Sequence, residues 1–340
     1  MTKQAHQVQE DLNLIFGHSV SDVRACKVSG NNKNYFFRRK DEALMIKYYF
    51  AHPQDKRDRL ATEWTFLSYL QQQNIPNVPR PVVKSDRHNA AVYTFLGGTV
   101  PTTEDISTSL VRQAAHFINN INRGRYNAHS AVLPDASESN INLDEFMANI
   151  EQRLALTGLQ AEDRDNHSLS EICSEMQSLF DRKKHALVAG TDQNNPLLEG
   201  VLPPDQRCLS PSDYGFHNTL LGDDSVISFI DFEYAGWDDP AKLICDFVLH
   251  PGVKINADLG RTFVDHINLE NINKQKLIYR CSQLFELMGI KWCCIVLNIF
   301  IPEHRQRRIF ANPDLNIDQE EAFQIEKARQ MLHKIKKSPF

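Results

Sequence analysis

Three polar side chains in the second half of the sequence have the types and the spacing needed for chemistry. Asp213 is followed five positions later by Asn218, and Asp231 closes the apolar run 226–230. An Asp can accept or orient the proton of a hydroxyl group, and an Asn with a second Asp can hold Mg²⁺ beneath nucleotide phosphates. The order D-x4-N, then an apolar strand ending in Asp, is typical of kinases. These residues therefore predict phosphoryl transfer.

The elements around these residues must bring them together. Residues 218–221 and 226–230 are separated by the polar turn 222–225, a pattern that predicts a β-hairpin. Such a hairpin places Asn218 and Asp231 at the same end of two paired strands, so that both can contact one metal ion.

The first hundred residues read mostly as strands. Short β-rich runs lie at residues 23–29, 34–39 and 43–50. The third run carries Lys47 in an apolar context, and residues 55–73 follow helical spacing with Glu63 beside the buried stripe. Glu63 can therefore pair with Lys47 and hold its ammonium toward nucleotide phosphates, although a lone strand lysine can also reach solvent at a sheet edge.

The turn between the first two strand runs, residues 29–34, is polar, and its backbone N–H groups could cover phosphates. It holds the single glycine Gly30 rather than G-x-G-x-x-G, so on its own a plain hairpin turn is the better explanation. The chain contains no G-x4-G-K-[ST] motif, which disfavours a P-loop NTPase.

A further strand pattern, residues 91–96, runs into the pair Gly97 and Gly98. This suits a connection between an N-terminal lobe (1–97) and a C-terminal lobe (98–340). Backbone groups at this connection could face an adenine edge, and the residues concerned are Thr94, Phe95 and Leu96. Beyond it, helical patterns predominate, with candidates at 105–122, 143–156, 169–187 and several more after residue 240.

Composition fits an ordinary globular enzyme of two lobes. The chain has 340 residues, of which 41% are apolar and 24% charged, and it carries a net charge of −5. This balance argues against nucleic acid or an anionic membrane as the main partner. The longest apolar run, near 295–301, contains Asn298 and falls well short of the ~20 residues that a membrane span needs.

Seven scattered cysteines, with no C-x-x-C pair, predict reduced thiols rather than a disulfide framework or a structural zinc site. The N-terminus is polar and has no hydrophobic signal core. We therefore expect a cytoplasmic protein, where ATP is available.

Two motifs of the chain resemble those of a known family. The stretches L-S-P-S-D-Y-G-F-H-N (209–218) and I-D-F-E-Y-A-G-W-D-D-P (230–240) are similar to those of aminoglycoside phosphotransferases and choline kinase-like proteins. The resemblance covers roughly residues 23–303, in the N-terminal half only through the order of elements. It implies an α+β, protein-kinase-like fold with a small β-rich N-lobe and a larger, mainly helical C-lobe.

The resemblance also implies roles for individual residues. Asp213 would be the catalytic base, and Asn218 with Asp231 would bind Mg²⁺. Lys47 would contact the α- and β-phosphates with Glu63 as its partner. The phosphates would be covered by Ser29, Gly30, Asn31 and Asn32.

Three departures from the family pattern stand out. The His that usually lies two positions before the catalytic Asp is Pro211 here, so the bracing of this loop must differ. His217 stands next to Asn218, where it could contact substrate or form a structural hydrogen bond. The later Asp of the second motif is Leu243, with Asp246 three positions beyond.

The remaining acids have structural explanations. Asp239, just before Pro240, is expected to cap a helix, and Asp246 is expected to bond back to the catalytic loop. Glu233 is not expected to be a metal ligand. Trp292, in the segment 279–303, could line an acceptor site, although core packing explains this segment equally well.

Together these observations predict an ATP- and Mg²⁺-dependent small-molecule kinase that phosphorylates a hydroxyl group. A catalytically silent kinase-fold binding protein is the alternative, and a protein kinase is disfavoured because an A-P-E motif and an activation segment are missing. The acceptor stays open among sugars, aminoglycosides and amino alcohols. Cationic acceptors would want an acidic cleft, and Glu286 and Glu303 are acids of the C-terminal helices.

Overall fold

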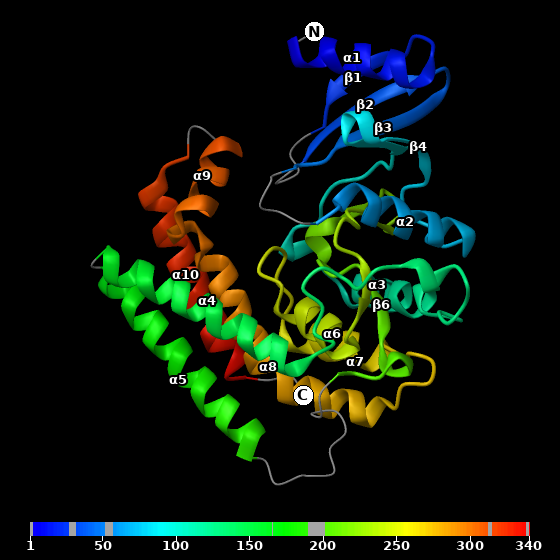
Figure 1. The fold of residues 1–340 in the computed structure, drawn as a ribbon. Coiled ribbons are helices and arrows are strands. Elements are labelled where there is room, and N and C mark those ends of the chain that lie inside the picture. Colours follow the sequence, from blue (N-terminus) through cyan, green and yellow to red (C-terminus); the bar gives the residue numbers. More distant parts are fainter. Residues whose placement is uncertain are drawn as a thin grey trace.

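The computed structural model describes residues 3–26, 32–51, 57–164, 166–189, 201–311, 315–337 and 340. The chain forms a small lobe built on an antiparallel sheet and a larger lobe that is mainly helical, as expected for a protein-kinase-like fold (Figure 1). Ser29, Gly30 and Asn31, which were predicted to cover phosphates, lie outside the described residues.

The sheet of the small lobe has five strands in the order β1-β2-β3-β5-β4, all antiparallel. The strands are β1 (Ser21–Ala25), β2 (Lys33–Arg39), β3 (Glu42–Tyr48), β4 (Pro81–Ser85) and β5 (Ala90–Thr94). Lys47 therefore lies on the central strand, paired with Asn34 on one side and Ala91 on the other. Because β3 is not an edge strand, Lys47 does not reach solvent at a sheet edge.

The two faces of the sheet are covered by different helices, because side chains alternate along each strand. Leu44 and Ile46 of β3 pack with α1 (Lys3–Phe16), which lies across the outer face (Figure 1). The opposite face, which carries Lys47, meets α2 (Arg59–Gln72), capped by the Asp58 side chain. The expectation of mostly strand for the first hundred residues was wrong for α1.

The connection out of the sheet is tight. Gly98 has a φ of +124°, and a Cβ added there would lie 2.7 Å from the carbonyl oxygen of Leu221. Thr99 exchanges two backbone hydrogen bonds with Leu221, at 3.1 and 2.8 Å. The chain thus passes from the sheet directly onto the predicted hairpin, whose strands are β7 (Thr219–Leu221) and β8 (Ile227–Phe229).

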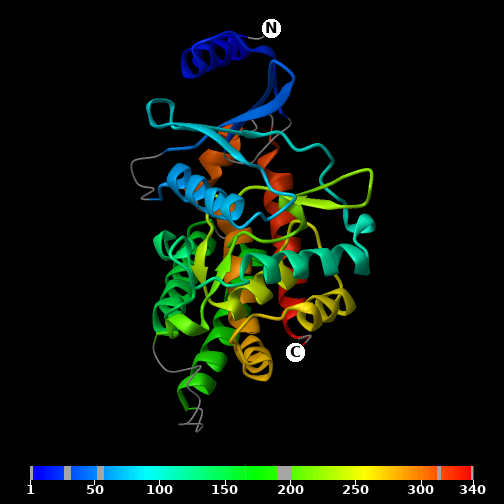
Figure 2. The same cartoon turned by 90° about the vertical axis from the view of Figure 1, so that its right-hand side faces the viewer.

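The large lobe contains most of the helices. They are α3 (Thr108–Ile121), α4 (Leu143–Asp163), α5 (His167–Ala189), α6 (Pro240–Leu249), α7 (Ala257–His266), α8 (Lys274–Val296), α9 (Pro302–Ala311) and α10 (Ile317–Ile335). Two short strands, β6 (Cys208–Ser210) and β9 (Gly236–Asp238), pair beside the loop of Asp213. The view turned by 90° shows the sheet and α1 stacked above this helical lobe (Figure 2).

α8 is the central helix of this lobe and packs against α4, α5, α6 and α10. By length and composition the segment Lys274–Phe300 could cross a membrane, but 72% of its most apolar stretch is buried inside the protein. Cys293 and Cys294 are buried in it, and all seven cysteines are free thiols, as the scattered cysteines predicted. Packing in the core accounts for the apolar character of α8.

Candidate active site

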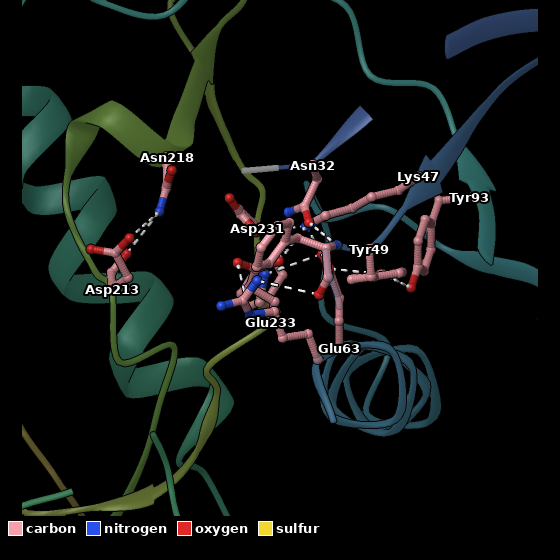
Figure 3. A network of polar contacts seen from close by, with 12 residues as sticks. Asn32, Lys47, Tyr49, Glu63, Tyr93, Asp213, Asn218, Asp231 and Glu233 are labelled. Carbon is pink, nitrogen blue, oxygen red and sulfur yellow. Dashed lines mark hydrogen bonds and ion pairs between the residues drawn. The ribbon is translucent and has the colours of Figure 1, made fainter. Parts of the chain in front are cut away.

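Lys47 is the centre of a buried polar cluster between the lobes (Figure 3). Its Nζ lies 2.7 Å from Glu63 Oε2 and 2.6 Å from Asp231 Oδ1. Glu233 Oε2 is 3.6 Å away. Burial alone would lower the pKa of Lys47, but the three carboxylates outweigh it and hold this pKa well above its ordinary value. The side chain therefore remains an ammonium ion.

Glu63, on α2, is fixed through both carboxylate oxygens. Oε2 also accepts a hydrogen bond from the Tyr49 hydroxyl at 2.8 Å, and Oε1 accepts one from the backbone N–H of Phe232 at 3.1 Å. The Tyr49 hydroxyl lies 2.7 Å from that of Tyr93. The predicted ion pair of Lys47 with Glu63 is thus present, and the two tyrosines are supporting residues that sequence reasoning missed.

Glu233 has a structural role that the sequence did not reveal. Its Oε2 accepts a hydrogen bond from Asn32 Nδ2 at 2.6 Å, and Arg59 Nε lies 3.9 Å from Oε1. Asn32 Oδ1 in turn accepts a hydrogen bond from the N–H of Phe50 at 3.2 Å. The Asn32 side chain is therefore turned into the protein, where it ties the start of β2 to the Lys47 cluster.

The oxygens of Glu63, Asp231 and Glu233 lie within 4.8 Å of one another. The Lys47 ammonium offsets part of their charge, so the three carboxylates surround a cation that the chain itself supplies. Asp231 differs from the other two because its side chain is 28% exposed, against 4% for Glu63 and 2% for Glu233. Asp231 is the carboxylate of the three that can also face a ligand.

Asp213 and Asn218 form a second group beside this cluster (Figure 3). Asn218 Nδ2 donates to the backbone oxygen of Asp213 at 2.9 Å and lies 3.4 Å from Asp213 Oδ2. The N–H of Ile230, next to Asp231, donates to the backbone oxygen of Asn218 at 3.0 Å. The hairpin therefore connects the Lys47 cluster to Asp213 through Asn218. Because Asn218 Nδ2 makes the contacts with Asp213, Asn218 Oδ1 takes no part in them.

Asp213 is braced by His250, at the C-terminal end of α6. His250 Nδ1 accepts a hydrogen bond from the backbone N–H of Gly252 at 3.0 Å, so Nε2 must carry the proton. That Nε2–H faces Asp213 Oδ1 at 3.2 Å. The loop thus has a brace from elsewhere in the chain, although Pro211 replaces the histidine of the family pattern. Sequence reasoning missed His250 because no spacing ties it to Asp213.

His217 stacks on His250 with a centroid separation of 3.7 Å and an interplanar angle of 6°. Its Nε2 lies 3.4 Å from Asp213 Oδ1, and it also borders the pocket described below, so both predicted roles of His217 remain open. The stack needs glycines on both sides. A Cβ added at Gly215 would lie 3.0 Å from His217 Nδ1, and one at Gly252 would lie 3.0 Å from His217 Cβ.

The two imidazoles set the charge of the Asp213 carboxyl. Partial burial on its own would raise the pKa of Asp213, but the polar contacts with His217 and His250 outweigh it and bring the pKa well below its ordinary value. The pKa of His250 is lowered because its ring is buried. Asp213 is therefore an ionised carboxylate next to a neutral His250 at neutral pH.

A pocket of about 360 Å³ opens beside Asp213. Its walls come from the Asp213 loop, from residues 137 and 138 ahead of α4, and from helices α6 and α8. The lining side chains are Arg57, Ser137, Glu138, Ser212, Asp213, His217, Tyr234, Lys242, Asp246, His250, Lys291, Trp292 and Ile295. Trp292 thus lines a cavity next to Asp213. This position is the one expected if the segment 279–303 lines an acceptor site.

The predicted adenine-binding segment follows β5. The N–H of Phe95 donates to the backbone oxygen of Ala43 at 3.0 Å, and Thr94 Oγ1 accepts from the N–H of Arg80 at 2.9 Å. The Phe95 ring is exposed and packs edge-on against Phe36, whereas Leu96 is half-buried. The Thr94 hydroxyl and the Phe95 amide thus already have partners within the sheet.

Of the acids near α6, Asp239 behaves as expected, whereas Asp246 bonds to Lys242 and Trp292 rather than directly to the catalytic loop. Asp239 caps the helix by accepting from the N–H of Ala241 at 2.8 Å. Asp246 pairs with Lys242 at 2.9 Å, and Lys242 Nζ lies 3.5 Å from Ser212 Oγ in the Asp213 loop. Asp246 therefore reaches the loop through Lys242, and Leu243, at the position of the family's Asp, is fully buried.

Comparisons with known proteins agree with this geometry. No curated protein sequence matches the chain. Among solved structures, the spectinomycin phosphotransferase APH(9)-Ia in complex with ADP and spectinomycin is similar, with a TM-score of 0.63 at 13% identity over 97% of this chain and 99% of that one. The choline kinase LicA from Streptococcus pneumoniae has a TM-score of 0.61 at 13% identity, over 98% and 100%.

These likenesses confirm the fold that the sequence motifs implied. A family model described as the phosphotransferase enzyme family matches residues 21–265, well over half of the chain. The protein therefore belongs to the phosphotransferase enzyme family.

Proposed function

We propose that this protein is an ATP- and Mg²⁺-dependent small-molecule kinase that transfers the γ-phosphoryl group to a hydroxyl of a sugar, aminoglycoside or amino alcohol. The observation that supports it most is the joint placement of Lys47, Asp231 and Asp213. A protonated lysine held by carboxylates and an ionised, braced aspartate are connected through one hairpin, with a pocket beside the aspartate. This arrangement suits catalysis by positioning and electrostatics.

In this proposal the N-lobe, residues 1–97, binds the nucleotide. Lys47 neutralises phosphate charge, and Glu63 keeps its ammonium in place. Residues 29–32 cover the phosphates, and the backbone of residues 94–96 faces the adenine.

Asn218 and Asp231 would hold Mg²⁺. Their oxygens are the hard donors that this ion prefers, and the Asn218 amide and the exposed side of Asp231 both have an oxygen to offer. A metal ion held there would supply positive charge to offset the charge of the nucleotide phosphates. Asp231 Oδ1 contacts Lys47, so lysine and metal would share one carboxylate.

On the acceptor side, Asp213 would orient the attacking hydroxyl and take up its proton as the new O–P bond forms and the bond from the γ-phosphorus to ADP breaks. The low pKa of Asp213 keeps its carboxylate ionised and able to accept the hydroxyl's hydrogen bond at neutral pH. His250 acts as a positioning residue, since its Nε2–H contacts the carboxylate and not the reacting atoms.

The direct pairing of Lys47 with Asp231 also favours a second candidate, a silent kinase-fold protein in which this ion pair replaces the metal. A thermal-shift titration with ATP, with and without Mg²⁺, separates the two. An ATP-induced increase in unfolding temperature that requires Mg²⁺ supports the kinase. Equal increases with and without Mg²⁺ support the silent protein.

Activity is tested by ADP release with Asp213→Asn. We expect turnover to be lost while ATP binding is kept, because the amide cannot accept the proton. Asp223→Asn, in the exposed turn of the same hairpin, is the matched control and should retain turnover. Near-normal turnover by Asp213→Asn on its acceptor would overturn the assignment of the base.

A further inference from the structure

The pocket beside Asp213 carries as many positive as negative side chains among its described lining residues. Its carboxylates are Glu138, Asp213 and Asp246, and its cations are Arg57, Lys242 and Lys291. The spatial pairing of these groups, rather than their number alone, determines which acceptor the pocket can bind.

Glu138, at the rim, is compensated by two cations. Lys291 Nζ, on α8, lies 2.9 Å from Glu138 Oε2, and Arg153 Nη2, on α4, lies 2.8 Å from Oε1. Burial would raise the pKa of Glu138, but Lys291 and then Arg153 outweigh it and lower this pKa to about 2. Both oxygens of this carboxylate are therefore already engaged by the protein.

Asp246, at the back wall, is compensated as well. Lys242 Nζ lies 2.9 Å from Asp246 Oδ2, and the indole N–H of Trp292 donates to Oδ1 at 2.8 Å. Lys242 is itself shared with the fully buried Asp238 at 2.9 Å. The carboxylate of Asp213 faces His250 and His217, as described above.

A cationic acceptor would thus find every carboxylate of the described lining engaged by a partner within the protein. Displacing Lys291 from Glu138 would leave a buried ammonium without its carboxylate, which costs several kcal/mol. Lys242 is held in place by Asp238 as well as by Asp246. An aromatic cage for a quaternary ammonium is also missing among the described residues, because Arg57 lies 5.3 Å over the Tyr234 ring. Glu286 and Glu303, the acids noted in the sequence, do not line the pocket.

The same surface suits an uncharged molecule rich in hydroxyl groups. Paired charges present both donors and acceptors to a neutral hydroxyl without needing net charge in return. Trp292 and Ile295 add an apolar wall for the C–H face of a ring. The volume of about 360 Å³ lies near the lower end for small-molecule sites, which range over roughly 300–1,000 Å³.

Building on the proposed kinase function, we infer that the acceptor is an uncharged polyhydroxylated molecule of about one ring, and neither a polycationic aminoglycoside nor a quaternary or primary amino alcohol. The pocket selects against positive charge because Glu138 and Asp246 are already paired with cations of the protein, while Asp213 is held by His250.

The test uses full-length protein and acceptors in pairs that differ in one charge. ADP release is measured with glucose against glucosamine, myo-inositol against an aminocyclitol, and glycerol against 3-amino-1,2-propanediol, with choline and kanamycin added. We expect kcat/KM to be at least tenfold higher for the neutral member of any pair that is used. Turnover of a cationic acceptor with no neutral one used, or no turnover of any neutral acceptor, overturns the inference.

A variant tests the charge pairing itself. Lys291→Gln removes one partner of Glu138, so the ratio of neutral to cationic kcat/KM should fall by about tenfold or more, because one unit charge at 4 Å contributes between about 1 kcal/mol in water and about 4 kcal/mol near a protein surface. Lys184→Gln, which removes an exposed pair with Glu151 on the outer helices, is the control and should leave the ratio unchanged. An unchanged ratio in Lys291→Gln contradicts the inference.

Mg²⁺-dependent ATP binding, measured without acceptor, keeps this inference separate from the proposed function. If binding is present and only cationic acceptors are used, the inference fails and the kinase assignment stands. If Mg²⁺-dependent binding is absent, the kinase assignment fails, and the inference fails with it.

Discussion

The brace on Asp213 gives a prediction whose magnitude follows from the structure. His250 makes two contacts through different ring nitrogens, Nδ1 to the Gly252 N–H and Nε2 to the Asp213 carboxylate. Two substitutions divide these contacts. His250→Asn keeps an acceptor near Nδ1 and loses the contact with Asp213, whereas His250→Gln keeps a donor near Nε2.

A hydrogen bond to a charged group contributes about 1.5–3 kcal/mol, equivalent to roughly 10- to 150-fold in a rate. The Asp213 side chain is 35% exposed, so water can replace part of the lost donor. We therefore expect His250→Asn to lower kcat by about 10- to 30-fold, near the lower end of this range. His250→Gln should lose less than about threefold.

The assay is steady-state ADP release with the best acceptor, with kcat and KM determined for both substrates. KM for ATP should stay constant, because His250 does not contact the nucleotide side. Thermal unfolding of both variants controls for a merely structural effect. Equal kcat values in the two variants, or a loss that follows the unfolding temperature alone, would refute the reasoning.

Three further outcomes follow. Lys47→Met leaves buried carboxylates without their cation, so unfolding free energy in urea should drop by about 3–5 kcal/mol, against at most about 1 kcal/mol for Lys84→Met in the exposed pair with Asp86. The pKa of His250 is lowered by burial, so its contribution to stability is complete above about pH 6.5 and is lost as the pH falls toward the folded-state pKa. Unfolding temperatures from pH 7 to 5 should show this loss, and His250→Gln should reduce it. Gly98→Ala should destabilise by at least about 1 kcal/mol because φ is positive and its Cβ meets the hairpin, whereas Gly97→Ala, with open space around it, should not.

Much of the candidate site could be predicted from local sequence. The hairpin that joins Asn218 to Asp231 follows from two apolar runs and a polar turn, and its strands pair as expected. The contact of Lys47 with Glu63 follows from one strand and the next helix, because an interior lysine requires a nearby carboxylate. These features are encoded over short stretches of chain.

The missed features have two different causes. Asn32 with Glu233, and His250 with Asp213, pair across 201 and 37 residues, and no periodicity marks such long-range contacts. In contrast, α1 was predictable, since Ala5, Val8 and Leu12 recur at helical spacing. The prediction of mostly strand for this region did not take that helical spacing into account.

The central claim is that the chain gathers Lys47, Asp213, Asn218 and Asp231 around a metal-bound nucleotide. Calorimetric titration of ATP into wild-type protein and into Asp231→Ala, each with and without Mg²⁺, tests it most directly. We predict that Mg²⁺ strengthens ATP binding to the wild type at least tenfold and does not change ATP binding to Asp231→Ala. The same Mg²⁺ dependence in both proteins, or none in the wild type, would contradict it.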